Sequence, residues 1–256
     1  MHVMNQEWRE LLFLHWEIDP EEIQKRLPPG LTVDTFEGKA YLGIVPFYMC
    51  GIGPSFTPGL PWCHNFLEMN VRTYVYDRHG LPGVWFYSLE ANNSLAVIVA
   101  SRLFHLPYYN AEVEASSPRV RLHKEFERTP LNFGEKGSVS YSCRRTREPA
   151  TETKTTFTYQ GKGNPETAEP GSLNYFLGER YVLFAYNRKK KRLYSGKVHH
   201  SPYPLEEADV SQFSCSETIA QAGFKESVPE NTPPCSALYS SGVKVRVYAL
   251  ERLPSP

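Results

Sequence analysis

Three polar side chains alternate along one short stretch of the chain. Residues 66–76 read FLEMNVRTYVY, and a period-two alternation over such a run is typical of a β-strand. Glu68, Asn70 and Arg72 would then share one face, because successive strand side chains point to opposite faces. A carboxylate, an amide and a guanidinium on one face can bind a small anionic or carbonyl compound, and the carboxylate can transfer protons.

Two environments are open for this polar face. A solvent-exposed sheet commonly carries such residues and needs no ligand. However, the opposite face, which includes Met69 and Thr73, is no more apolar than an ordinary core face, and the neighbouring segments are hydrophobic. A strand buried on both sides would place charges inside the protein, which is costly unless they pair or bind a ligand. We therefore expect a polar-lined cavity with aromatic residues at its rim.

The remaining candidate motifs favour structural roles. His199 and His200 are adjacent, so on a strand they point to opposite faces and cannot easily bind one metal ion. We expect a buried, hydrogen-bonded histidine there, with a ligand contact as the alternative, and no metal site or cofactor. The basic run at residues 188–192 (RKKKR) is typical of a solvated turn between strands. Cys63 and His64 are sequence neighbours, which rarely align as nucleophile and base.

Charge and hydropathy exclude two classes of partner. The 256 residues hold 28 Lys and Arg against 28 Asp and Glu, so the net charge is zero. A nucleic-acid or anionic-membrane surface would need a basic excess. The longest apolar run, residues 95–100, is far shorter than the ~20 residues of a membrane span. We expect neither nucleic acid nor membrane as a partner, and either a monomer or a homodimer.

The cysteines indicate a reducing compartment. The five cysteines are scattered and form no C-x-x-C pair, which removes the common zinc and redox spacings. The first ten residues mix in His, Asn, Gln, Glu and Arg and lack the apolar stretch of a signal peptide. We therefore expect a cytoplasmic protein with reduced thiols.

Local patterns predict a sheet-rich fold. Asp19 and Pro20 mark the start of a helix, and Asn93 can cap a buried helix over residues 95–104. We expect a hairpin between residues 33–36 and 40–48, and a loop over residues 51–61. Strands are predicted at residues 11–18, 66–76, 83–91, 108–115, 137–145, 153–160, 180–186, 193–200, 212–219 and 243–250, with a short helix near residues 172–177. The fold class is therefore α+β, one domain over residues 1–256, with a mostly antiparallel, barrel-like sheet.

Several longer motifs resemble one known family and occur in order between about residues 8 and 250. They are LFLHW (12–16), LPPGL (27–31), VPF (45–47), EMNVRTY (68–74), GVWF (83–86) and HHSP (199–202). This pattern resembles the YqjF-like family of bacterial proteins of unknown function, which is placed in the acetoacetate-decarboxylase-like superfamily. The resemblance implies a β-barrel-like α+β fold around an internal cavity.

The resemblance also identifies site residues and one departure. The superfamily's decarboxylase forms a Schiff base through a lysine whose pKa is lowered by desolvation and by a second lysine. In the matching stretch, Arg102 corresponds to a site arginine, but Tyr108 and Tyr109 stand where the two lysines would be. A phenol cannot form an iminium. The resemblance further aligns a buried glutamate with Glu68 and an N-terminal arginine with Arg9.

These observations predict a binder of small organic acids or carbonyl compounds. Any catalysis would be of the lyase or isomerase type, with Glu68 as acid or base and Tyr108 as a proton donor or oxyanion partner. The ligand-binding residues would be Arg9, Asn70, Arg72, Trp85, Arg102 and Tyr109. The alternatives are a non-catalytic ligand-binding or protein-interaction module, and a Schiff-base enzyme that uses another lysine, such as Lys39, Lys124 or Lys197.

Overall fold

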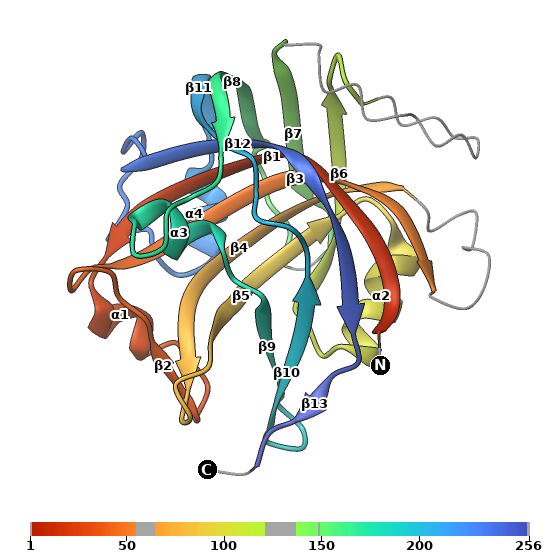
Figure 1. Ribbon diagram of the computed structural model, residues 1–256, viewed down its shortest axis with the longest axis vertical. Coiled ribbons are helices and arrows are strands. Elements are labelled where there is room, and N and C mark those ends of the chain that lie inside the picture. The colour runs from red at the N-terminus through yellow and green to blue at the C-terminus, as the bar shows by residue number, and fades with distance from the viewer. Residues whose placement is uncertain (1, 55–64, 121–136, 148, 255–256) are drawn as a thin grey trace.

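A computed structural model describes residues 2–54, 65–120, 137–147 and 149–254 (Figure 1). The helices are α1 (Pro20–Gln24), α2 (Ser94–Leu103), α3 (Leu173–Gly178) and α4 (Ser216–Gln221). The strands are β1 (His2–Ile18), β2 (Leu31–Val33), β3 (Ala40–Pro54), β4 (Phe66–Asp77), β5 (Pro82–Ala91), β6 (Tyr108–Ser116), β7 (Val139–Arg145), β8 (Thr155–Glu166), β9 (Val182–Asn187), β10 (Arg192–His199), β11 (Leu205–Ser214), β12 (Ser236–Tyr248) and β13 (Glu251–Arg252).

One large twisted sheet contains all the described strands. Their order is β13-β10-β9-β5-β6-β7-β8-β11-β12-β1-β3-β4-β2, and β10 also pairs with β12 and β5 with β4. Among the pairings of these described strands, only β5–β6 and β5–β9 are parallel. The α+β class with a mostly antiparallel sheet and a few short helices is thus confirmed. The extra pairings close a circuit through β12, β1, β3, β4, β5, β9 and β10, so the sheet curls around an interior without being one regular barrel.

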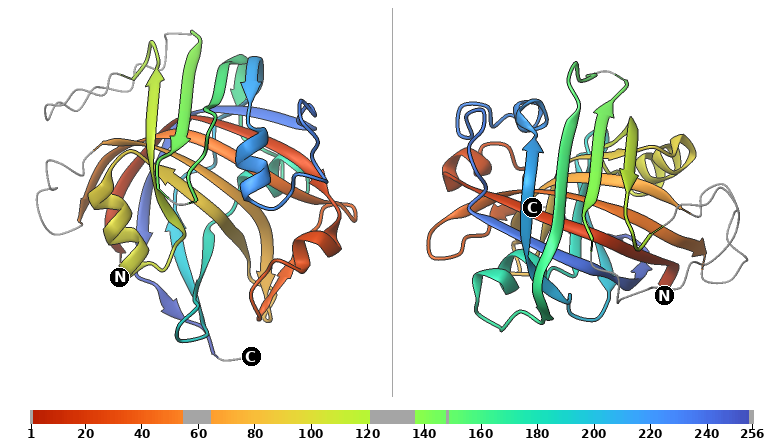
Figure 2. Two further views of the ribbon diagram at one scale, coloured as in Figure 1. Left: turned by 180° about the vertical axis from the view of Figure 1, so that it is seen from behind. Right: turned by 90° about the horizontal axis from the view of Figure 1, so that it is seen from above.

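The long central strands separate two apolar cores. Strands β1, β3 and β12 cross the molecule side by side, as the red, orange and dark blue ribbons of Figure 2 show. Leu12, Leu14 and Trp16 pack into one core, whereas Leu11 and Phe13 pack into the other. The second core surrounds the cavity described below, so these strands are buried on both faces.

Two irregularities change which residues face the cavity. Glu10 in β1 has a φ of 53°, and Gly242 on the paired strand β12 has a φ of 135°. A Cβ at Gly242 would lie 2.2 Å from the carbonyl oxygen of Trp8, so only glycine fits there. Around this point the alternation of β1 side chains between the two faces of the sheet shifts by one residue. As a result, Trp8 and Leu11, which are three positions apart, both face the cavity. A second register shift in the β4–β5 pair likewise turns both Phe86 and Leu89 to the cavity.

Several local predictions are confirmed. The Asp19 side chain accepts a hydrogen bond from the Glu21 N–H at 2.9 Å at the start of α1. The Asn93 side chain accepts one from the Ala96 N–H at 3.0 Å and caps α2. The strands predicted at residues 66–76 and 83–91 are present as β4 and β5, which pair antiparallel. The basic run 188–192 forms the turn between β9 and β10 and enters β10 at Arg192.

Other local predictions are wrong. Strand β2 pairs with its neighbour β4 and not with β3. Of the hairpin expected between residues 33–36 and 40–48, the described residues show only an isolated bridge between Phe36 and Lys39. Strand β3 continues to Pro54, into the expected loop. The expected strand at 212–219 ends at Ser214 and is followed by α4. Helix α2 is not buried, because Ile98 and Leu103 are 45% and 67% exposed.

No helix among the described residues is long and apolar enough to span a membrane.

Candidate functional site

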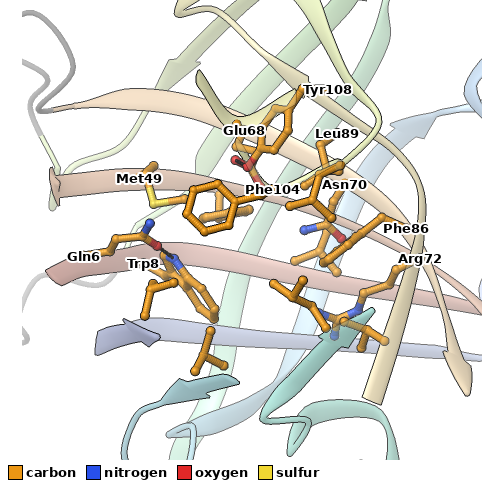
Figure 3. A pocket seen from close by; sticks show the side chains of 18 of the residues that line it. Gln6, Trp8, Met49, Glu68, Asn70, Arg72, Phe86, Leu89, Phe104 and Tyr108 are labelled. Atoms are coloured by element: carbon orange, nitrogen blue, oxygen red, sulfur yellow. Dashed lines mark hydrogen bonds between the residues drawn. The ribbon is translucent and has the colours of Figure 1, made fainter. Parts of the chain in front are cut away.

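A cavity of about 360 Å³ lies inside the circuit of strands, with helix α2 forming one wall. Most of its lining side chains are aliphatic or aromatic, so the expectation of a polar-lined cavity is wrong. Its polar groups are few, and those of Glu68, Asn70 and Arg72 all come from β4 (Figure 3). The alternation in β4 therefore does place these three residues on one buried face, as the sequence predicted.

Glu68 is a buried carboxyl group that faces this apolar space. Its residue is 3% exposed, and the Tyr108 hydroxyl donates a hydrogen bond to Oε2 at 2.8 Å. Burial raises the pKa of Glu68 to about 8, and the nearby Glu90 carboxyl adds to the rise, whereas the hydrogen bond from Tyr108 opposes it. Burial also raises the pKa of Tyr108 well above its usual range. At neutral pH the pair is therefore mostly uncharged.

The sheet register brings Tyr108 to Glu68. The β4–β5 pairing places Glu68 opposite Ala91, and the parallel β5–β6 pairing places Leu89 beside Tyr108. The chain between α2 and β6 is fixed by a hydrogen bond from the Leu89 N–H to the Pro107 carbonyl at 3.0 Å. Tyr108 thus begins β6 with its hydroxyl directed across β5 toward the carboxyl group.

Arg72 is a buried cation without a counterion among the described residues. It is 8% exposed, it donates to the Leu177 carbonyl at 3.2 Å and to the Tyr74 hydroxyl oxygen at 3.4 Å, and its Nε has no partner. His15 lies behind it, with Nε2 2.6 Å from the Tyr74 hydroxyl. Burial and the Arg72 charge lower the pKa of His15 well below its usual value, so the imidazole is neutral. A buried guanidinium that lines a cavity and has no ion-pair partner among the described residues can bind an anion.

Asn70 lies between these two groups along β4. It is 5% exposed and its Oδ1 has no hydrogen-bond partner. At about 3.3 Å per strand residue, the backbone positions of Glu68 and Arg72 are about 13 Å apart. A ligand that reaches both therefore passes Asn70, whose amide can bind its middle part.

Four other residues predicted for the site do not line the cavity. Arg9 follows the cavity-facing Trp8 in β1, so it points to the other side, where its Nε donates to Glu7 at 3.1 Å. Trp85 lies between the cavity-facing Val84 and Phe86, and it packs in a separate apolar cluster. The reason in both cases is strand alternation.

The other two are Arg102 and Tyr109. Arg102 is exposed in the last turn of α2. Tyr109 follows Tyr108 in β6 and points away from it, with its ring centroid 3.9 Å from the Arg145 guanidinium carbon. Arg145 in turn forms a buried ion pair with Glu90. The side chain of Arg145 is 5% exposed and that of Glu90 is 3% exposed. This cluster lies outside the cavity lining.

Four lining residues with polar groups, Gln6, Trp8, Arg180 and Tyr203, were not predicted from the sequence. Gln6 and Trp8 are joined by a 2.9 Å hydrogen bond from the indole N–H, and Arg180 pairs with Asp34 at 2.6 Å. The alternation Met4–Gln6–Trp8 would have identified the first two, had the first strand been extended to the N-terminal residues. No comparable pattern precedes Arg180, which follows α3.

The histidine pair separates as expected for strand neighbours. His199 is exposed, whereas His200 is 4% exposed, and its Nδ1 lies 2.7 Å from the Ser201 carbonyl oxygen. Its ring packs against Tyr181 and Tyr203, with centroids 4.7 and 4.6 Å away. No group of three metal-binding side chains occurs in the described part of the chain. The Cys63–His64 pair lies outside the described residues.

No lysine is among the described residues that line the cavity. Lys39 and Lys197 are exposed and pair with Glu17 and Glu251 at the surface. Lys124 lies outside the described residues.

Comparisons with known proteins agree with this architecture. The model of the family DUF2071, described as an uncharacterized conserved protein, matches residues 5–244. The uncharacterized protein YqjF of Bacillus subtilis (strain 168) is 31% identical over 231 residues, which are 90% of this chain and 85% of that protein.

Solved structures show the fold. An acetoacetate decarboxylase-like enzyme from Sphingomonas wittichii RW1 superposes with a TM-score of 0.63 at 13% identity, covering 100% of this chain and 95% of that one. The acetoacetate decarboxylase from Legionella pneumophila gives 0.59 at 10% identity, over 98% and 87%. The enduracididine biosynthesis enzyme MppR, complexed with the condensation product of pyruvate and imidazole 4-carboxaldehyde, gives 0.63 at 13% identity, over 98% and 88%.

Proposed function

Because the chain belongs to the DUF2071 family of uncharacterized proteins and has an acetoacetate decarboxylase-like fold, we propose that its cavity binds a small organic acid with a carbonyl group and transfers protons on it. The observation that supports this most strongly is the Glu68 carboxyl group, which is buried, faces the cavity and has a pKa raised to about 8. A carboxyl group with a pKa near the working pH can both take up and return a proton.

In this proposal, each polar group of the cavity has a different role. Arg72 binds the carboxylate of the ligand, because it has no counterion among the described residues. Glu68, as carboxylate, removes a proton from the carbon beside the carbonyl group. The C–H electron pair moves into the carbonyl to give an enolate, and the proton now on Glu68 returns to carbon. Tyr108 stays a neutral phenol and holds Glu68 in place.

A second function is a non-catalytic binding module. The observation in its favour is that Glu68 and Tyr108 already hydrogen-bond to each other within a mostly apolar lining. In that case, organic acids would raise the melting temperature of the protein without any chemistry on the ligand.

Exchange of deuterium into oxo acids in D₂O, followed by NMR, separates the two functions. We expect exchange to increase with pH around a midpoint of about 8, because Glu68 must be ionised to act as the base. Glu68→Gln should slow it by roughly 10²–10⁴-fold, the usual contribution of a general base.

Two tyrosine variants form a matched pair for this test. Tyr108→Phe removes the hydrogen bond that lowers the pKa of Glu68, so the midpoint should move to higher pH. Tyr109→Phe keeps the aromatic contact with Arg145 outside the cavity lining and should leave the profile unchanged. Exchange that is as fast in Glu68→Gln as in the unmodified protein would contradict the proposal.

A further inference from the structure

We infer that the ligand of this cavity is an amphiphile, with its carboxylate at Arg72 and an unbranched apolar tail that extends along β4 toward Met49 and helix α2. The inference rests on the proposed function for the position of the carboxylate. It adds the class of acid: one with a medium-length hydrocarbon tail, rather than a compact oxo acid of a few carbons.

The charge of the cavity is concentrated at one end. Arg72 lies there as an unpaired guanidinium, with an Nε that has no partner. Arg180 also lines the cavity, but Asp34 already neutralises it at 2.6 Å. Glu68 is uncharged at neutral pH, because its pKa is raised to about 8. A single anionic group therefore matches the net charge of the lining, and Arg72 is where it binds.

The cavity is too long for a compact acid. Its lining includes four alternate residues of β4, from Phe66 to Arg72, whose backbone positions are six residue steps and so about 20 Å apart at 3.3 Å per step. Figure 3 shows Met49 and Gln6 at the opposite side of the cavity from Arg72. A compact acid held at Arg72 would leave the far part filled only by water against apolar walls.

The walls of this far part suit a hydrocarbon chain. Met49 and Ile52 from β3 face Ala96, Ala100 and Phe104 from the α2 segment. The alanines leave room beside the helix, and methionine adapts its flexible side chain to an unbranched tail. The polar side chain at this end, Gln6, already accepts the hydrogen bond of Trp8 at 2.9 Å. These contacts favour a tail without further charge.

Isothermal titration calorimetry of the full chain with straight-chain saturated acids, from acetate to tetradecanoate, tests the inference. We expect the affinity to rise roughly fourfold with each added methylene until the cavity is full, and then to level off or fall. The matching alcohols should bind about 10- to 100-fold more weakly, since they cannot make charged hydrogen bonds with Arg72. Affinity that is flat with chain length, or highest for acetate, would overturn the inference.

Variants locate the two ends of the ligand. Arg72→Met should remove the preference for acids over alcohols but keep the dependence on chain length. Ala100→Phe fills the tail region and should shorten the best-bound acid by several carbons. Ile98→Phe is its control, because Ile98 is 45% exposed on the same helix and does not line the cavity. An unchanged preference for acids in Arg72→Met would refute the position of the carboxylate.

The saturated acids separate this inference from the proposed function, because they have no carbonyl group to enolise. Chain-length dependence without any deuterium exchange into oxo acids would support the ligand class and refute the proton transfer. Deuterium exchange that depends on Glu68, together with tight binding of short acids alone, would support the proton transfer and refute the ligand class.

Discussion

The variant Glu68→Gln is expected to gain stability relative to the unmodified protein as pH rises from 5 to 9. In the folded state the pKa of Glu68 is raised from 4.5 to about 8 by burial. Between these values the unfolded chain has released the proton and the folded chain still holds it, so stability falls as pH rises. Above about 8 both states are ionised and the decline ends. Glutamine cannot ionise, so the variant lacks this loss, which amounts to roughly 4–5 kcal/mol.

Urea unfolding at a series of pH values measures this effect. The free energy of unfolding of the unmodified protein should decrease relative to Glu68→Gln across this range. Glu114→Gln is a suitable control, because Glu114 pairs with Lys154 at the surface and its side chain is 79% exposed. Its stability should follow that of the unmodified protein. Parallel stability profiles for Glu68→Gln and the unmodified protein would show that Glu68 has an ordinary pKa in the folded state.

Replacement of Arg145 by methionine should strongly destabilise the protein. The Arg145–Glu90 ion pair is almost fully buried, so the variant leaves a buried carboxyl group without its cation. Removing one partner of such a buried pair typically lowers the free energy of unfolding by about 3–5 kcal/mol. For a chain of this length that corresponds to a loss of roughly 6–20 °C in melting temperature. Thermal unfolding followed by circular dichroism measures it.

The adjacent arginine gives the matched control. Arg144 pairs with Glu112 at 2.6 Å, but their side chains are 38% and 58% exposed. Arg144→Met should therefore change stability by less than about 1 kcal/mol. The double variant Glu90→Gln/Arg145→Met should recover much of the loss, since no unpaired charge remains buried. Equal effects of Arg144→Met and Arg145→Met would refute the role of burial.

The central part of the site could be predicted from local sequence. Alternation in residues 66–76 is long and regular, and it identifies both the strand and the shared face of Glu68, Asn70 and Arg72. Helix α2 was predictable for a similar reason, since Asn93 caps it directly. These features depend on residues close together in the chain, where propensity and period are informative.

The rest depends on contacts distant in sequence. The shift of alternation near Glu10 requires Gly242 on the paired strand β12. The residues of β1 before that shift include Asn5 and Glu7, whose polarity hides the strand. Strand β2 pairs with β4 rather than with its neighbour β3 in sequence. None of these pairings has a signal in a short window of sequence.

The family resemblance pointed to Tyr108, which lines the cavity, but it did not indicate where the side chains of Tyr109 and Arg102 point. Tyr109 follows it in the same strand and so points away, into the Arg145 cluster. Arg102 lies in the last turn of α2, where its side chain is exposed. A motif locates a segment, whereas strand alternation and helix orientation decide which of its side chains reach a cavity.

Both the proposed base and the charge balance of the cavity depend on a buried carboxyl group whose pKa is raised to about 8. The most direct test is an NMR titration of the protein labelled with ¹³C at the glutamate carboxyl groups, with the Glu68 signal assigned by its absence in Glu68→Gln. A titration midpoint of about 8 is the expected result. A midpoint near or below 5 would place an ordinary carboxylate in this position and would contradict both the proposed base and the charge balance of the cavity.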